Sequence, residues 1–198
     1  MCVIAYIPKE AKELSRDILE KMWSCNPHGA GIMWLNNNHH NHQVGFSKGY
    51  FYFEDFYRDY LIIKRDYNYE CVIHFRIATS GGISRTMCHP FALTNSISKI
   101  MNTYGTSDVL VMHNGIIKID TAEHLNDTCM YIINKLYPRY EKNRRFFTDK
   151  KQEEIIKNEI GYSKLCFLSS DGVKLIGNWS KYKDCYFSNL YFMEMEYV

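Results

Sequence analysis

An apolar run gives way to a polar, glycine-containing break within the segment Cys71-Val72-Ile73-His74-Phe75-Arg76-Ile77-Ala78-Thr79-Ser80-Gly81-Gly82. The run Cys71 to Ile77 is short and strongly apolar, which predicts a buried strand. Arg76 sits late in that strand, where an unpaired guanidinium would be costly to bury. We therefore expect Arg76 to meet a carboxylate, which belongs either to a substrate or to an Asp or Glu of the protein itself.

Other short apolar runs predict further strands, and the two runs around the polar tract Asn36 to Asn41 predict a hairpin. The predicted strands are Cys2 to Ile7, Ile32 to Leu35, Val44 to Phe46, Val109 to Met112, Lys164 to Leu168, Val173 to Ile176 and Cys185 to Tyr191. The Asn114-Gly115 pair predicts a turn after the strand that ends at Met112.

Helical spacing of apolar residues predicts the helices that separate these strands. They are Lys9 to Trp23, Phe51 to Ile63, Ala122 to Leu136 and a more exposed helix in the charged segment before Glu159. Because strands and helices come in blocks, the pattern favours an α+β protein with antiparallel sheets covered by helices. We find no linker or repeat, so residues 1–198 are expected to form a single domain.

Composition excludes several classes of function. The net charge is +2 from 24 Lys and Arg against 22 Asp and Glu, which gives no electrostatic case for a nucleic-acid partner. Seven cysteines without a Cys-x-x-Cys pair argue for reduced thiols in a cytoplasm. No signal peptide is evident, and no apolar run approaches the ~20 residues of a membrane span. We expect a cytoplasmic protein that binds neither nucleic acid nor membrane.

Cys2 would become the first residue once Met1 is removed, which a small second residue favours. Thiol nucleophile and α-amine base then belong to the same residue. The free amine has a reference pKa of ~7.7 to 8.0, so it can accept the thiol proton near neutral pH.

Four downstream motifs accompany Met1-Cys2 in a fixed order. They are His74-Phe75-Arg76-Ile77-Ala78-Thr79-Ser80-Gly81, Cys88-His89-Pro90-Phe91, His113-Asn114-Gly115 and Asn126-Asp127-Thr128. Their order and spacing resemble class II glutamine amidotransferases, in which Met-Cys-Gly is followed by His-x-Arg-x-Ala-Thr-x-Gly, Asn-x-His-Pro, His-Asn-Gly and Ser-Asp-Thr. The likeness covers Cys2 to Thr128.

The resemblance implies the N-terminal-nucleophile hydrolase fold, a four-layer αββα sandwich. It also implies that Cys2 attacks a side-chain amide while Asn114 and Gly115 stabilise the oxyanion. Arg76 would bind the α-carboxylate of the substrate, a role that its bidentate geometry suits. Asp127 would bind the α-amino group, although as a helix-capping residue it has an alternative, purely structural role.

Three further residues are expected to support the substrate pocket by the same resemblance. They are Thr79, His74 and His89.

The expected activity is hydrolysis of glutamine through a thioester, with ammonia passed to a separate acceptor protein because no acceptor domain is present. The alternatives are an amidohydrolase acting on another γ-glutamyl or small amide, and a catalytically silent binding domain. Departures from the pattern at Val3, His28 and Cys88, where the family often has Gly, an acidic residue and Asn, bear on substrate preference rather than on the reaction.

A metal site at His39, His40 and His42 is the competing hypothesis, because imidazoles bind zinc, copper and nickel. Adjacent ligands in a polar turn rarely complete a tetrahedral site unaided. We therefore expect neither a metal nor another cofactor.

Overall fold

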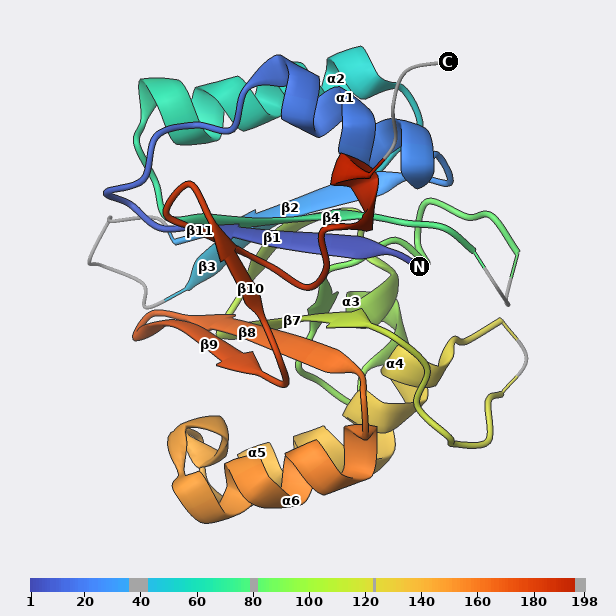
Figure 1. The fold of residues 1–198 in the computed structure, drawn as a ribbon. Helices are drawn as coiled ribbons and strands as arrows, with labels where there is room; N and C mark the ends of the chain where they lie inside the picture. The colour runs from blue at the N-terminus through green and yellow to red at the C-terminus, as the bar shows by residue number, and fades with distance from the viewer. Residues whose placement is uncertain (36–42, 79–81, 123, 195–198) are drawn as a thin grey trace.

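The computed structural model describes residues 1–35, 43–78, 82–122 and 124–194, and the strands in these ranges form two antiparallel sheets (Figure 1). The large sheet has the order β10-β11-β1-β4-β2-β3-β6, and the small sheet has the order β5-β7-β8-β9. The strands are β1 (Val3–Ile7), β2 (Ala30–Trp34), β3 (Val44–Tyr50), β4 (Cys71–Phe75), β5 (Phe91–Ala92), β6 (Tyr104–Ser107), β7 (Val109–Asn114), β8 (Lys164–Ser169), β9 (Gly172–Ile176), β10 (Ser180–Tyr182) and β11 (Cys185–Phe187).

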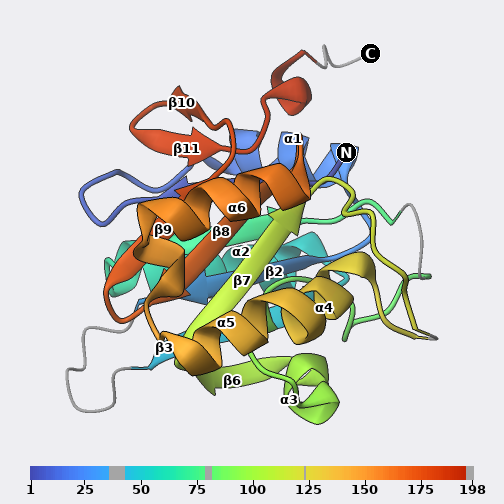
Figure 2. The same ribbon diagram turned by 90° about the horizontal axis from the view of Figure 1, so that it is seen from below.

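Helices cover the outer faces of both sheets, as Figures 1 and 2 show. Helices α1 (Arg16–Cys25) and α2 (Phe53–Leu61) lie over the large sheet, and α2 continues into a π-helical turn, Ile62–Asp66. The small sheet is covered by α4 (Asp127–Tyr131), α5 (Tyr137–Lys142) and α6 (Lys150–Ile160), with a second π-helical turn, Ile132–Leu136, joining α4 to α5. The short α3 (Ile97–Met101) connects β5 to β6.

Alternating side chains let each sheet bury both of its faces. In β1, Val3 and Ala5 belong to the core beneath α1 and α2, whereas Ile4 belongs to the core between the sheets. In β7, Val111 packs toward the helices of the small sheet and Met112 packs toward the large sheet. By the same period of two, Cys2 and Asn114 fall on the side of Ile4 and Met112, so these two polar residues share the space between the sheets.

The sequence correctly predicted antiparallel sheets with helices, and the β2–β3 hairpin is confirmed. The Asn36 to Asn41 tract that joins its strands lies outside the described residues. Strand β7 runs through Asn114 rather than ending at Met112, and the chain turns at Gly115 with a φ of 137°.

The predicted helix from Lys9 begins only at Arg16, because tertiary hydrogen bonds hold the preceding segment in another conformation. Lys64 Nζ donates to the carbonyl oxygens of Pro8 (2.8 Å) and Lys9 (3.0 Å), and Tyr60 Oη accepts from the backbone N–H of Leu14 at 2.7 Å. Leu14 is nevertheless buried, so its apolar character reflected the core rather than a helix.

The predicted helix from Ala122 begins only at Asp127, because Asn126 caps it by accepting a hydrogen bond from Cys129 N at 2.9 Å. At the other end, helical structure continues past Leu136 into α5. Two predicted strands are too long: β4 ends at Phe75, and β11 ends at Phe187 before a 3₁₀ turn, Tyr191–Met193.

Candidate functional site

Cys2 lies immediately before β1, beside the segment that follows β4. Its Sγ is 3.5 Å from the carbonyl oxygen of Ile77 and 3.4 Å from the N–H of the same residue. Burial raises the pKa of the Cys2 thiol, although the Ile77 N–H and the positive charges of the N-terminus and Arg76 oppose the shift. The thiol is therefore protonated at neutral pH and needs a base before it can act as a nucleophile.

Asn114 ends β7 in the small sheet, and Ser188 joins it to the large sheet. Ser188 Oγ lies 2.8 Å from Asn114 Nδ2 and accepts a hydrogen bond from Ile4 N at 2.9 Å. Asn114 Oδ1 has no hydrogen-bond partner among the described residues. If the amide is turned by 180°, Ser188 donates its own proton to Oδ1, and Nδ2 becomes a donor available to a substrate.

Gly115 follows with a φ of 137°, a conformation that L side chains rarely adopt. A Cβ at this position would collide with Ser163, whose own Cβ would lie only 2.7 Å away. The Ser163 hydroxyl bonds both backbone groups of Ile116, at 3.1 Å from its nitrogen and 3.2 Å from its oxygen. Because Ser163 lies so close, only glycine fits at position 115 without a shift of its neighbours.

Cys2, Asn114 and Gly115 line one cavity of about 550 Å³. The rest of its wall comes from the segments next to Cys2, after β7 and from α6 to β8. These residues are Met1, Ile77, Ile116, Lys118, Asn158, Glu159, Ile160, Gly161, Tyr162, Ser163 and Lys164. The thiol and the Asn-Gly pair therefore open onto the same space, although they come from different sheets.

Arg76 follows β4 directly and is buried, with only 5% of its surface exposed. The backbone on either side is anchored to the loop before β2, because Arg76 N donates to Gly29 O at 2.8 Å and His28 N donates to Arg76 O at 2.9 Å. Its guanidinium Nη2 donates to the carbonyl oxygen of Gly82 at 2.9 Å. The guanidinium is thus held in a fixed position near Cys2, where its charge contributes to the thiol pKa.

Asp127 begins α4, where its carboxylate fixes two stretches of backbone. Oδ2 accepts from Ile117 N at 2.8 Å, and Oδ1 accepts from Thr128 N at 2.8 Å. These bonds tie the loop after β7 to the start of α4, which is the structural role considered for this residue. Oδ1 also accepts from Thr128 Oγ1 at 3.3 Å, whereas Oδ2 retains a lone pair that can accept a further hydrogen bond.

His74 and His89 belong to a buried group of three imidazoles that also includes His113. The His74 and His89 rings lie 4.4 Å apart, and Thr128 Oγ1 lies 3.3 Å from His89 Nε2 and 2.9 Å from His113 Nδ1. Burial lowers the pKa of His74 to about 3, that of His113 to about 4 and that of His89 well below its ordinary value. All three are therefore neutral at pH 7.

Some predicted residues fall outside the described part of the chain. Thr79 and the cluster of His39, His40 and His42 do so. His28, which in the sequence is only a departure from the family pattern, accepts a hydrogen bond from Ala78 N at 2.9 Å. It thus supports the segment beside Cys2. Ser163 and Ser188 were missed, because a single serine far along the chain carries no signal of what it will touch.

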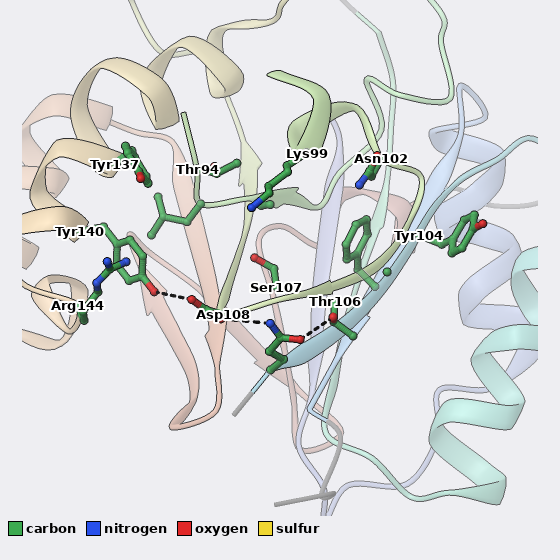
Figure 3. Close-up of a pocket in the computed structure, with 15 residues that line it drawn as sticks. Thr94, Lys99, Asn102, Tyr104, Thr106, Ser107, Asp108, Tyr137, Tyr140 and Arg144 are labelled. Carbon is green, nitrogen blue, oxygen red and sulfur yellow. Dashed lines mark hydrogen bonds between the residues drawn. The ribbon is translucent and has the colours of Figure 1, made fainter. Parts of the chain in front are cut away.

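A second cavity, of about 400 Å³, lies near the edge strand β6 (Figure 3). None of the predicted site residues that the structure describes lines it. Asp108 Oδ2 in this cavity accepts a hydrogen bond from Tyr140 Oη at 3.5 Å, and Thr106 Oγ1 donates to Gln43 Oε1 at 2.7 Å. Some of its polar groups thus bond to one another.

In the described ranges, no group of three His, Cys, Asp or Glu side chains is arranged to hold a metal ion. All seven cysteines are free thiols. No helix among the described residues combines the length and apolarity needed to cross a membrane.

Comparison with models of known protein families gives no match. Comparison with curated protein sequences gives none either.

Proposed function

We propose that this protein is an N-terminal-nucleophile amidohydrolase of the class II glutamine amidotransferase type. The observation that carries the proposal is the shared cavity, since a nucleophile and an Asn-Gly pair from separate sheets converge on it. The order of layers supports the αββα sandwich of that class, because helices cover the outer face of each sheet while the two sheets pack together.

In this mechanism the reaction begins after removal of Met1, because an α-nitrogen held in a peptide bond is not a base. The freed amine of Cys2 takes the thiol proton, and Sγ attacks the amide carbon. Asn114 and the Gly115 N–H stabilise the oxyanion. The C–N bond then breaks, the leaving nitrogen takes the proton, and water hydrolyses the thioester to a carboxylic acid and the thiol.

The proposed substrate is glutamine or another γ-glutamyl amide. Arg76 has the burial and the charge to bind an α-carboxylate, and Asp127 retains acceptor capacity for an α-amino group. With glutamine the leaving group is ammonia, which would pass to a separate acceptor protein or into water.

The first test combines intact mass with amide hydrolysis. Mass spectrometry of the cytoplasmically expressed protein is expected to show loss of Met1. Cys2→Ala is expected to abolish release of glutamate, because no other thiol borders the cavity among the described residues. The matched control is Cys25→Ala, at another half-buried thiol, which should retain the wild-type rate. Full retention of Met1, or an active Cys2→Ala protein, would refute the mechanism.

Ammonia release separates a coupled amidotransferase from an independent amidohydrolase. A coupled enzyme limits futile hydrolysis by completing its site only when the acceptor is present. We expect low glutaminase activity from the purified protein and higher activity with cell extract or the products of neighbouring genes. Strong activity in isolation would favour the independent amidohydrolase.

A further inference from the structure

Apart from Met1, which the proposed mechanism removes, four apolar side chains among the described residues line the cavity beside Cys2. Ile77, Ile116, Ile160 and Tyr162 contribute to its wall. Two of them reach the surface, since Ile116 is 72% exposed and Tyr162 is 100% exposed. Large apolar side chains gathered at the mouth of a cavity are typical of a ligand site. Ammonia, a small polar product, gains no binding free energy from contact with such apolar side chains.

Two lysines and one glutamate contribute charged groups to the described wall of this cavity. Glu159 directs its carboxylate away to Tyr131 Oη at 2.6 Å and to the Arg139 guanidinium at 2.8 Å and 2.5 Å. Lys118 and Lys164 also line the cavity. Their positive charge disfavours a cationic group in the cavity and leaves neutral apolar groups favoured.

The residues proposed to hold the glutamyl group are separate from the wall of this cavity. Neither Arg76 nor Asp127 is among the described residues that line it. Asp127 starts α4, and Figure 2 shows β7 running between α4 and α5 on one side and α6 on the other. The cavity wall includes the end of α6 together with Ile116 and Lys118, which flank the Ile117 N–H that Asp127 binds, so Asp127 contacts the backbone of this wall without lining the cavity.

We propose that this cavity binds an apolar substituent on the amide nitrogen, so that the preferred substrate is a secondary γ-glutamyl amide of an uncharged apolar amine. This inference rests on the proposed function. The bond that breaks is still the amide C–N bond, and the thioester forms at Cys2 Sγ. The amine R–NH₂ leaves with the proton taken from the thiol, and water then releases glutamate.

The first experiment measures kcat/KM for the γ-glutamyl amides of methylamine, ethylamine, n-propylamine and n-butylamine. Each added methylene should raise kcat/KM roughly fourfold until the cavity is filled, as expected for burial of one CH₂. The n-pentylamide should exceed the amide of 1,4-diaminobutane, which has the same length but a cationic end. A flat series, or a preference for the cationic amide, would overturn the inference.

Variants at the cavity mouth connect the effect to its wall. Ile116→Ser and Tyr162→Ser should flatten the chain-length dependence, lowering the ratio of butylamide to methylamide kcat/KM at least severalfold. Tyr104→Ser is the matched control. Tyr104 is 77% exposed on β6 at the far edge of the large sheet (Figure 3), so its change should leave the ratio as in the wild type. Unchanged ratios in both cavity variants would remove the cavity from its role.

A binding measurement separates failure of this inference from failure of the proposed function. Calorimetry on Cys2→Ala protein should show affinity that rises from the γ-glutamyl methylamide to the butylamide and falls in the double variant with Tyr162→Ser. Binding of this kind without hydrolysis by the wild type would refute the catalytic function and keep the ligand site. Glutamine hydrolysis without a chain-length effect would refute only the ligand site. Faster hydrolysis of butyramide than of glutamine would place the apolar group on the acyl side and overturn the inference.

Discussion

Ser188 shows how much of the candidate site depends on single polar side chains between the sheets. Its hydroxyl is buried and bonds both Ile4 N in β1 and the Asn114 amide in β7. It therefore sets the distance between the strand that presents Cys2 and the residue proposed to stabilise the oxyanion. We treat it as a positioning residue, because it acts on the reaction only through Asn114.

Ser188→Ala is expected to lower kcat for glutamine roughly tenfold or more while leaving KM near its wild-type value. The change frees the Asn114 amide to rotate, and a lost oxyanion donor costs about 10²-fold to 10³-fold in kcat. It also leaves Ile4 N unsatisfied, at a cost of about 1–3 kcal/mol in stability. Steady-state kinetics and urea unfolding measure both effects. Ser169→Ala, at another buried serine near a strand end, should spare kcat; equal losses in both variants would contradict the assigned role.

Arg76→Ala is expected to raise KM for glutamine steeply, because it removes a charge-assisted contact with the α-carboxylate that is worth about 1.5–3 kcal/mol. A glutamine whose α-carboxyl group is blocked as an amide should lose far less. Comparing the two substrates on wild type and variant removes any general effect of the substitution on folding. If the variant impairs both substrates equally, Arg76 does not bind the carboxylate.

At the scale of elements, Lys48 ties β3 to the segment that contains β5 and α3. Its Nζ donates to Ile100 O at 2.8 Å and lies 4.1 Å from the centre of the Phe91 ring. Burial lowers the pKa of the Lys48 ammonium to about 7. The unfolded lysine keeps its proton up to about pH 10.4, so between these values the unfolded state binds more protons and stability rises with pH.

The stability of the wild type relative to Lys48→Met should therefore increase from pH 7 to pH 9, by about 1.4 kcal/mol per pH unit. Urea unfolding of both proteins at pH 7, 8 and 9 measures this difference, and the comparison cancels the other titrating groups. Lys99→Met changes an exposed lysine of α3 and should show no such trend. A pH-independent difference for Lys48→Met would mean that the buried ammonium stays charged.

For the whole molecule, the three buried imidazoles predict sensitivity to acid. Each has a lowered pKa, about 3 for His74, about 4 for His113 and well below the ordinary value for His89, so the unfolded chain takes up protons near pH 6.5 while the folded chain does so only at lower pH. Their stabilising effect is thus complete above about pH 6.5 and is lost as the pH falls, at about 1.4 kcal/mol per pH unit for each imidazole.

His89→Gln tests this by removing one of the three protons taken up on unfolding. Denaturant unfolding between pH 7 and pH 5 should show a steep loss of stability in the wild type and a slope lower by about one proton in the variant. The test uses the slope of stability against pH, which depends only on proton uptake and not on the absolute stability of the variant. Equal slopes would show that His89 is not buried as a neutral imidazole.

The sequence by itself determined the fold class, the short apolar strands and the candidate catalytic and binding residues. Alternation and helical spacing depend on near neighbours in the chain, so strands beginning at Cys71 and at Val109 and the β2–β3 hairpin could be predicted from pattern alone, although the ends of these two strands could not. The order of the motifs likewise singled out Cys2, Arg76 and Asn114 before any geometry was known.

Only the tertiary structure determined where these residues meet and what surrounds them. Leu14 is buried without a helix because Lys64 and Tyr60, some fifty residues away, hold its segment. Ser188 joins Ile4 to Asn114 across the two sheets. The apolar cavity combines the ends of β7 and α6 with Cys2. Such contacts form between segments distant in the sequence, and packing between layers selects them, so no local pattern of residues encodes them.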